Sequence, residues 1–426
     1  MGKKKPLSRK TQFFLLALVP ACFTVLGVFL QPLHTLEEGI PAILKEPDFL
    51  ITDYFAVGGP GATLLNAGAV TLICIYLVYR LGMEIDGHTI TSVCLMFGFS
   101  LFGKNVMNIW SILLGVWIYA RYHRTSLSRY IYIGFYGTSL SPIITQLMQL
   151  GHLPVAGRLL LAIAVGIVIG FVLPPLCTHA HFAHRGFSLY NVGFAGGIIA
   201  IAVVSLFKSF GLKIETRLIW SSEYTGEFAV ILATVLAAFI TAGLLPSPRT
   251  TFRGYLRILK AAGTGGSDYV KEVGIRPVLL NMGINGYFAV GFVLLTGGDL
   301  NGPTIGSVFT ILGFSATGKH LRNIAPVMAG VWIASLTKSW DISDPSAVLA
   351  LLLSTTLAPI AGQFGMLWGI AAGFLHSSVA LNVGIVYSGM NLYNNGFAGG
   401  IVAMFLVPLI QSFVNRKARA SGEISL

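Results

Sequence analysis

Residues 98–104 read Gly-Phe-Ser-Leu-Phe-Gly-Lys, and residues 313–319 read Gly-Phe-Ser-Ala-Thr-Gly-Lys. The two stretches lie 215 residues apart, and further matching pairs follow in the same order along the chain. An ordered series of this length predicts that the chain consists of two homologous halves. The other matching pairs are 64–68 with 279–283, 115–117 with 330–332, 140–146 with 357–363 and 189–197 with 392–400.

The composition indicates the environment of these halves. Of the 426 residues, 54% are hydrophobic and only 10% are charged, against about 25% charged in a soluble domain. High hydrophobicity excludes a disordered chain, and four cysteines exclude a disulfide scaffold. The apolar runs are long and continuous, unlike the short alternating segments of a β-barrel. We therefore expect an all-α polytopic membrane protein with the lipid bilayer as its surroundings.

Two apolar runs lie outside the repeat. Residues 11–30 predict an extra N-terminal span, and residues 227–245 predict a span that links the halves. The expected divisions are a basic N-terminus with the extra helix (1–47), the first repeat (48–210), the linker (211–262), the second repeat (263–415) and a tail (416–426).

Within each half, two apolar segments are too short to cross a bilayer alone. In the first half they cover about 89–102 and 106–120, and they meet at Gly103-Lys104-Asn105. The second half has the same join at Gly318-Lys319-His320. Short segments that meet at glycine in both halves of a repeat are typical of broken or re-entrant helices in transporters.

The net charge of +12 is concentrated in short flanks of the apolar runs. This pattern follows the positive-inside rule and argues against nucleic-acid binding. It places both termini in the cytoplasm, and we expect a bacterial cytoplasmic (inner) membrane. The basic loop 121–129 corresponds to the acidic loop 338–344, so the halves are expected to be inverted relative to each other.

Polar and aromatic residues shared by both halves are the candidates for a substrate pathway. Amides inside apolar runs need partners, because lipid offers none. The bland alternative is that they only join helices by hydrogen bonds. The candidate pathway residues are Asn66, Asn281, Phe99, Ser100, Phe314, Ser315, Gln146, Gln363, Tyr190, Asn191, Phe194, Tyr393, Asn394 and Phe397.

Lys104 and Lys319 are the membrane-adjacent charges that occur at equivalent positions of both halves. They are candidates for a charged gate or an anion site. The alternative is that each lysine extends to the interface or neutralises a helix C-terminus.

One cluster resembles a metal site by spacing. His179, His181 and His184 follow Cys177, but the second half has no such cluster, so a solvated loop is the preferred interpretation. We expect no metal and no other cofactor. Common hydrolase and phosphate-binding motifs are absent from the sequence, which favours a protein that is not an enzyme.

The repeated Gly-Phe-Ser-x-x-Gly-Lys and Leu-Tyr-Asn-x-Gly-Phe-Ala-Gly-Gly blocks resemble an uncharacterised family of bacterial repeat-bearing membrane proteins (domain of unknown function 1576). This resemblance implies no activity. More distantly, Tyr190-Asn191-Val192-Gly193 is similar to a segment of the urea transporters. That resemblance implies two inverted halves around a pore and a homo-oligomer, a trimer or a dimer. The two extra spans and the lysines depart from that family.

These observations lead to one preferred function and two alternatives. The preferred one is a channel or facilitator for a small polar solute such as urea or a small amide, with the pathway between the inverted halves. The first alternative is an ion-coupled secondary transporter of a small, potentially anionic, substrate. The second is a metal-handling protein built on the three histidines.

Overall fold

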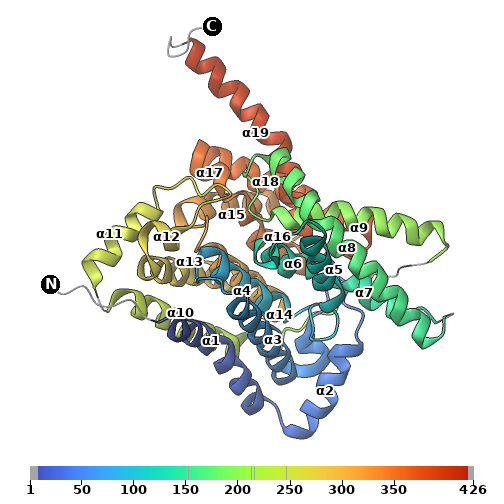
Figure 1. Cartoon of the computed structure of the whole chain (residues 1–426). Helices are drawn as coiled ribbons and strands as arrows, with labels where there is room; N and C mark the ends of the chain where they lie inside the picture. Colours follow the sequence, from blue (N-terminus) through green and yellow to red (C-terminus); the bar gives the residue numbers. More distant parts are fainter. Residues whose placement is uncertain (1–7, 152, 213, 215, 246, 421–426) are drawn as a thin grey trace.

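The computed structural model describes residues 8–420 except 152, 213, 215 and 246, and this part of the chain is mostly helical and contains no β-strand (Figure 1). The first half contains α3 (Tyr54–Arg80), α4 (Gly87–Phe99), α5 (Trp110–Tyr122), α6 (Ile131–Gly137), α7 (Ser141–Met148), α8 (Val155–His184) and α9 (Asn191–Ser209). The second half contains α12 (Tyr269–Val273), α13 (Ile275–Leu295), α14 (Gly302–Phe314), α15 (Leu321–Ser335), α16 (Pro345–Leu353), α17 (Ala358–Phe364), α18 (Met366–Val383) and α19 (Asn394–Ala420). Short 3-10 turns cover Leu127–Arg129, Thr138–Leu140, Ser354–Leu357 and Gly384–Tyr387.

The remaining helices lie outside the repeat. The predicted N-terminal and linker spans are present as α1 (Arg9–Leu30) and α10 (Thr225–Leu244). Two amphipathic helices, α2 (Leu33–Lys45) and α11 (Pro248–Ile258), were not expected from the apolar runs. Figure 1 shows α3, α4, α13 and α14 near the centre of the molecule, with α1 and α10 at one edge.

Within the described residues, nine helical stretches are long and apolar enough to cross a bilayer. A lipid bilayer solvates such stretches because every backbone polar group is paired inside the helix. The chain is therefore an all-α multi-pass membrane protein. The predicted short segments are also present: α4 and α14 have 13 residues each, well below the roughly 20 residues of a full span.

Equivalent residues start the two short helices in the same way. Asp86 caps α4 and Asn301 caps α14, and each forms a capping box with the threonine three residues later. Such a cap pairs backbone N–H groups that the first turn leaves free. The repeated sequence thus encodes a repeated local structure.

The two halves contact each other reciprocally, as they must if a two-fold axis relates them. Asp53 accepts a hydrogen bond from Gly302 N at 3.1 Å, and its equivalent Asp268 accepts one from Gly87 N at 3.1 Å. Leu189 N donates to Thr356 O, and Leu392 N donates to Ser139 O, both at 3.0 Å.

The central helices α4 and α14 run antiparallel. Gly98, near the end of α4, packs against Gly306, near the start of α14, whereas Gly313 packs against Thr91. Two helices related by a two-fold axis are antiparallel only if that axis is perpendicular to them. The opposite orientation of the halves across the bilayer stays a prediction, and so does the sidedness of the termini.

Candidate functional site

Asn66 and Asn281 form hydrogen bonds to the non-helical segments that follow the short helices α4 and α14. The side-chain amide of Asn66 donates to Ser100 O at 2.8 Å and to Lys104 O at 2.9 Å. That of Asn281 donates to Ser315 O at 2.8 Å and to Lys319 O at 2.7 Å. These carbonyl groups have lost their helical partners, so the amides supply the missing donors.

Each break places a lysine in the interior of the protein, and both lysines are fully buried. Lys104 Nζ donates to Tyr393 Oη at 2.9 Å and to Phe135 O at 3.1 Å. Lys319 Nζ donates to Tyr190 Oη and to Thr355 Oγ1, the latter at 2.7 Å. Within the described residues, neither ammonium group has a carboxylate among its hydrogen-bond or ion-pair partners.

Aromatic rings from both halves cover the lysines. Lys104 Nζ lies 5.5 Å from the ring centre of Phe99 and 4.8 Å from that of Tyr393. Lys319 Nζ lies 5.2 Å from the ring centre of Phe314 and 4.5 Å from that of Tyr190. Each pair combines a phenylalanine of the same half with a tyrosine of the other half, so both halves build each lysine site.

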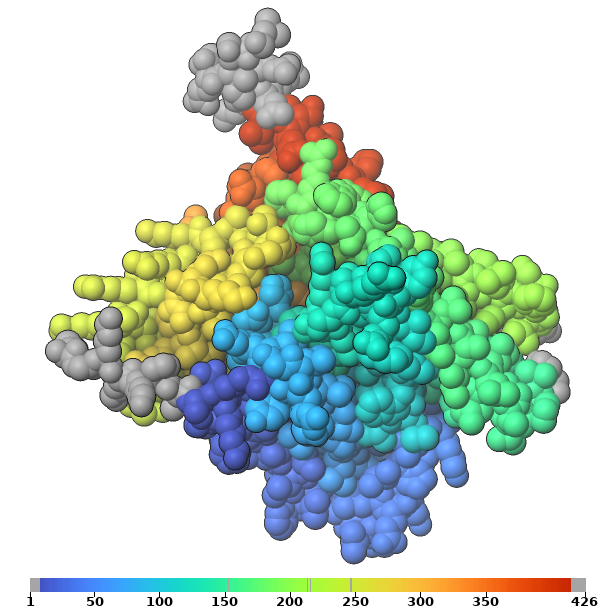
Figure 2. Space-filling model, in the orientation of Figure 1, coloured from blue at the N-terminus to red at the C-terminus, as the bar shows by residue number. Residues whose placement is uncertain are grey.

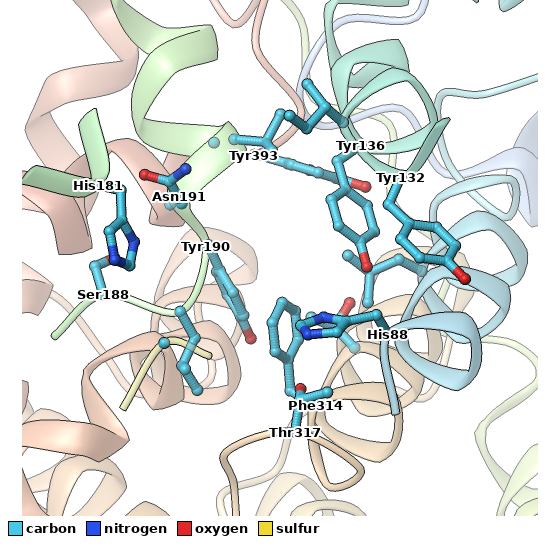
Figure 3. Close-up of a pocket in the computed structure, with 18 of the residues that line it drawn as sticks. His88, Tyr132, Tyr136, His181, Ser188, Tyr190, Asn191, Phe314, Thr317 and Tyr393 are labelled. Carbon is cyan, nitrogen blue, oxygen red and sulfur yellow. The ribbon is translucent and has the colours of Figure 1, made fainter. Parts of the chain in front are cut away.

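A cavity of about 350 Å³ lies between these aromatic pairs. Figure 3 shows the rings of Tyr136, Tyr190, Tyr393 and Phe314 around its open centre. In Figure 2 the surface is hollowed between α4, α6 and the segment that precedes α12. The other lining residues are His88, Leu95, Phe99, Arg129, Tyr132, Ile133, His181, Ser188, Leu189, Asn191, Val192, Gly193, Gly265, Gly266, Thr310, Thr317, Leu353, Asn395 and Gly396.

The cavity departs from the two-fold symmetry. Its outer wall includes His88, Tyr132 and Tyr136 of the first half. The equivalent residues of the second half are Pro303, Leu349 and Leu353, and all three are buried. Of these, only Leu353 touches the cavity. The wall that is open in one half is therefore packed in the other.

The structure brings together some of the predicted pathway residues and separates others. Phe99, Phe314, Tyr190, Asn191 and Tyr393 line the cavity. The two lysines lie behind its aromatic wall. Residues outside the lining are Asn66, Asn281, Ser100, Ser315, Gln146, Gln363, Phe194, Asn394 and Phe397.

Contacts explain several of these outer positions. Phe194 and Phe397 stack on each other across the two halves, with ring centres 5.8 Å apart. Asn394 donates to Ala380 O at 2.8 Å and accepts from Tyr387. Gln363 is exposed on the surface. The alternative of helix-joining hydrogen bonds therefore describes Asn66, Asn281 and Asn394.

The three histidines do not converge on one point, although the rings of His181 and His184 lie edge to face with their centres 5.7 Å apart. His179 is exposed, His181 lines the cavity, and His184 is buried and bonded to Asn191 Oδ1 at 2.9 Å. Among the residues with described positions, no group of three potential ligands could hold a metal ion.

Comparison of the two halves of the sequence did not identify most of the residues in the cavity's outer wall. Tyr132, Tyr136 and His88 have different residues at the equivalent positions, so a search for shared residues passes over them. Thr310, Thr317 and Asn395 lack an identical counterpart for the same reason.

An ion triad joins the halves on the open side of the cavity. Lys271 Nζ lies 2.8 Å from Asp86 Oδ2 and 3.1 Å from Asp268 Oδ2. Burial raises the pKa of Asp86, but hydrogen bonds from Lys271 and Thr89 outweigh it and hold that pKa below its ordinary value. Hydrogen bonds to Asp86 and Asp268 raise the pKa of Lys271. At the equivalent position of the first half Lys271 is replaced by Ala56, so this ionic contact is also asymmetric.

The fold and site thus define a polytopic helical membrane protein with a cavity between two homologous halves. The chain belongs to the family described as "Protein of unknown function (DUF1576)", which matches residues 33–209 and 247–412. The two matched regions cover almost all of the two halves, together with α2 and α11. Comparison with curated proteins and with solved structures found no match. The resemblance to urea transporters stays a prediction.

Proposed function

We propose that the protein is a membrane transport protein that carries one small solute at a time through the cavity between its halves. The observation that carries this proposal is the cavity's asymmetry. Both halves contribute its inner wall, but its outer wall is open at Tyr132 and packed at the equivalent Leu349.

A cavity wall that is open in one half and packed in the other suits alternating access. If the halves exchanged conformations, the open wall would pack and the packed wall would open, around the same inner site. A channel needs a path that is open at both ends at once. The asymmetry therefore favours a carrier over a channel.

Uptake into proteoliposomes tests transport itself. We expect the uptake of a small solute to saturate with its concentration. Unlabelled solute on the opposite side should accelerate this uptake, because a carrier changes its orientation faster when a solute is bound. The panel contains urea, acetamide and benzoate, with protein-free vesicles as the control. Uptake without saturation or acceleration would support a channel, and uptake equal to that of empty vesicles for the whole panel would refute transport of these solutes.

Cysteine labelling tests the alternation of access. Tyr132→Cys and Leu349→Cys are matched by the repeat and would be made in a variant without the exposed Cys22. With a membrane-impermeant thiol reagent, Tyr132→Cys should react from one side only. Leu349→Cys should react from the other side, and only while a transported solute is present. Fixed labelling of Leu349→Cys, whether or not solute is added, would contradict alternation.

A further inference from the structure

The residues around the cavity include basic side chains without matching acidic ones. Lys104 and Lys319 are both fully buried, and the cavity lining contains Arg129 but no aspartate or glutamate. The acidic groups of the ion triad, Asp86 and Asp268, are already paired with Lys271. Taking an ammonium ion out of water costs several kcal/mol unless an opposite charge or good hydrogen bonds compensate.

The protein compensates each lysine only in part. Ring faces attract a cation, and the tyrosine hydroxyl groups accept its hydrogen bonds. A tyrosine hydroxyl that accepts a hydrogen bond still has its own proton to donate. Tyr190 and Tyr393 also line the cavity, so their hydroxyl groups can donate hydrogen bonds to a bound solute. The lysine that donates to each hydroxyl group makes that group a stronger donor.

Backbone dipoles add to this field. The helices α9 and α19 begin at Asn191 and Asn394, directly after the two tyrosines. The two helix starts meet, because Gly193 packs against Gly396. The N-terminus of a helix carries a partial positive charge and free N–H groups, and both favour an anion.

Much of the rest of the cavity is apolar and aromatic, although Ser188, Thr310, Thr317 and Asn395 also line it. Leu95, Leu353 and the rings of Phe99 and Phe314 form its inner surface. A volume of about 350 Å³ suits a small molecule rather than a peptide or a lipid. The shape and the charge together specify a solute with one anionic end and a flat apolar body.

We propose that the cavity binds a small organic anion, such as an aromatic carboxylate, with its charged end near Tyr190 and Tyr393. This inference rests on the proposed function for its meaning as a transport substrate, but it concerns binding and is tested by binding. A neutral polar solute, favoured by the sequence, would gain less from the two buried lysines, whose charged form a bound anion stabilises.

Calorimetric titration of the purified full chain in detergent tests the proposal. The probes are benzoate and benzamide, which share a flat ring and differ in charge. We expect benzoate to bind at least about tenfold more tightly, a difference of about 1.4 kcal/mol, because a charged hydrogen bond is stronger than a neutral one. Lys104→Met with Lys319→Met should remove this preference, and Lys338→Met should keep it. Lys338 is the matched control, since its ammonium also lies over a ring, that of Phe374, but away from the cavity.

A second pair of variants tests the proposal even if the lysine variants do not fold. Tyr190→Phe and Tyr393→Phe keep the rings and remove the hydroxyl groups, so each should weaken benzoate binding several-fold with little effect on benzamide. Equal affinities for the two probes, no binding of benzoate, or unchanged binding in the double lysine variant would each overturn the proposal. Benzoate binding without uptake would refute the transport function only. Uptake of acetamide without benzoate binding would refute the anion only.

Discussion

Gly306→Leu is expected to prevent assembly of the two halves. A Cβ atom at Gly306 would lie 2.4 Å from the carbonyl oxygen of Gly98 and 2.6 Å from Phe102. These are contacts with the backbone and a buried ring, which cannot move aside without separating α4 from α14. Overpacking commonly costs 1–3 kcal/mol, and we expect about 3 kcal/mol or more here because a backbone is displaced.

Thermal melting in detergent, read by size-exclusion chromatography, measures this effect. Gly291→Leu is the matched control: Gly291 is also a helical glycine, but a Cβ atom there meets nothing within 4 Å. That variant should melt at or above the wild-type temperature, since leucine favours a helix over glycine by up to about 1 kcal/mol. A Gly306→Leu protein as stable as Gly291→Leu would show that the α4–α14 contact is wrong.

Asn66→Leu is expected to have the second largest effect and to lower the stability of the fold rather than to change transport directly. The change removes both donors to Ser100 O and Lys104 O and the acceptor of Val106 N. Each buried group left unpaired costs about 1–3 kcal/mol, so the loss should be about 3 kcal/mol or more. Lys104 would also lose its anchored position.

The repeat supplies an internal comparison for this prediction. Asn281→Leu removes the two equivalent donors, but Asn285 already reaches Lys319 O at 3.4 Å and can replace one of them. Asn281→Leu should therefore lower the melting temperature less than Asn66→Leu does. Asn382→Leu, at an exposed helix position, is the neutral control. If Asn66→Leu altered uptake alone and left melting unchanged, Asn66 would be a pathway residue after all.

Much of the fold could be read from the sequence. The repeated Gly-Phe-Ser-x-x-Gly-Lys blocks predicted two halves and a helix break at Lys104 and Lys319, and both features are present. Such features are local or repeated, so periodicity and self-comparison detect them. The amphipathic helices α2 and α11 were missed because a search for long apolar runs ignores helices with one polar face.

The sequence alone determined that the protein is an all-α membrane protein of two homologous halves, because composition and repetition are properties of the chain itself. Only the tertiary structure decided the site. It placed the Asn66 amide against the break that follows α4 and Tyr393 beside Lys104, 289 positions away along the chain. It also showed that Tyr132 lines a cavity while its equivalent Leu349 is packed. Such neighbours depend on how distant helices meet, and the asymmetry of the cavity lies where the two halves differ in sequence.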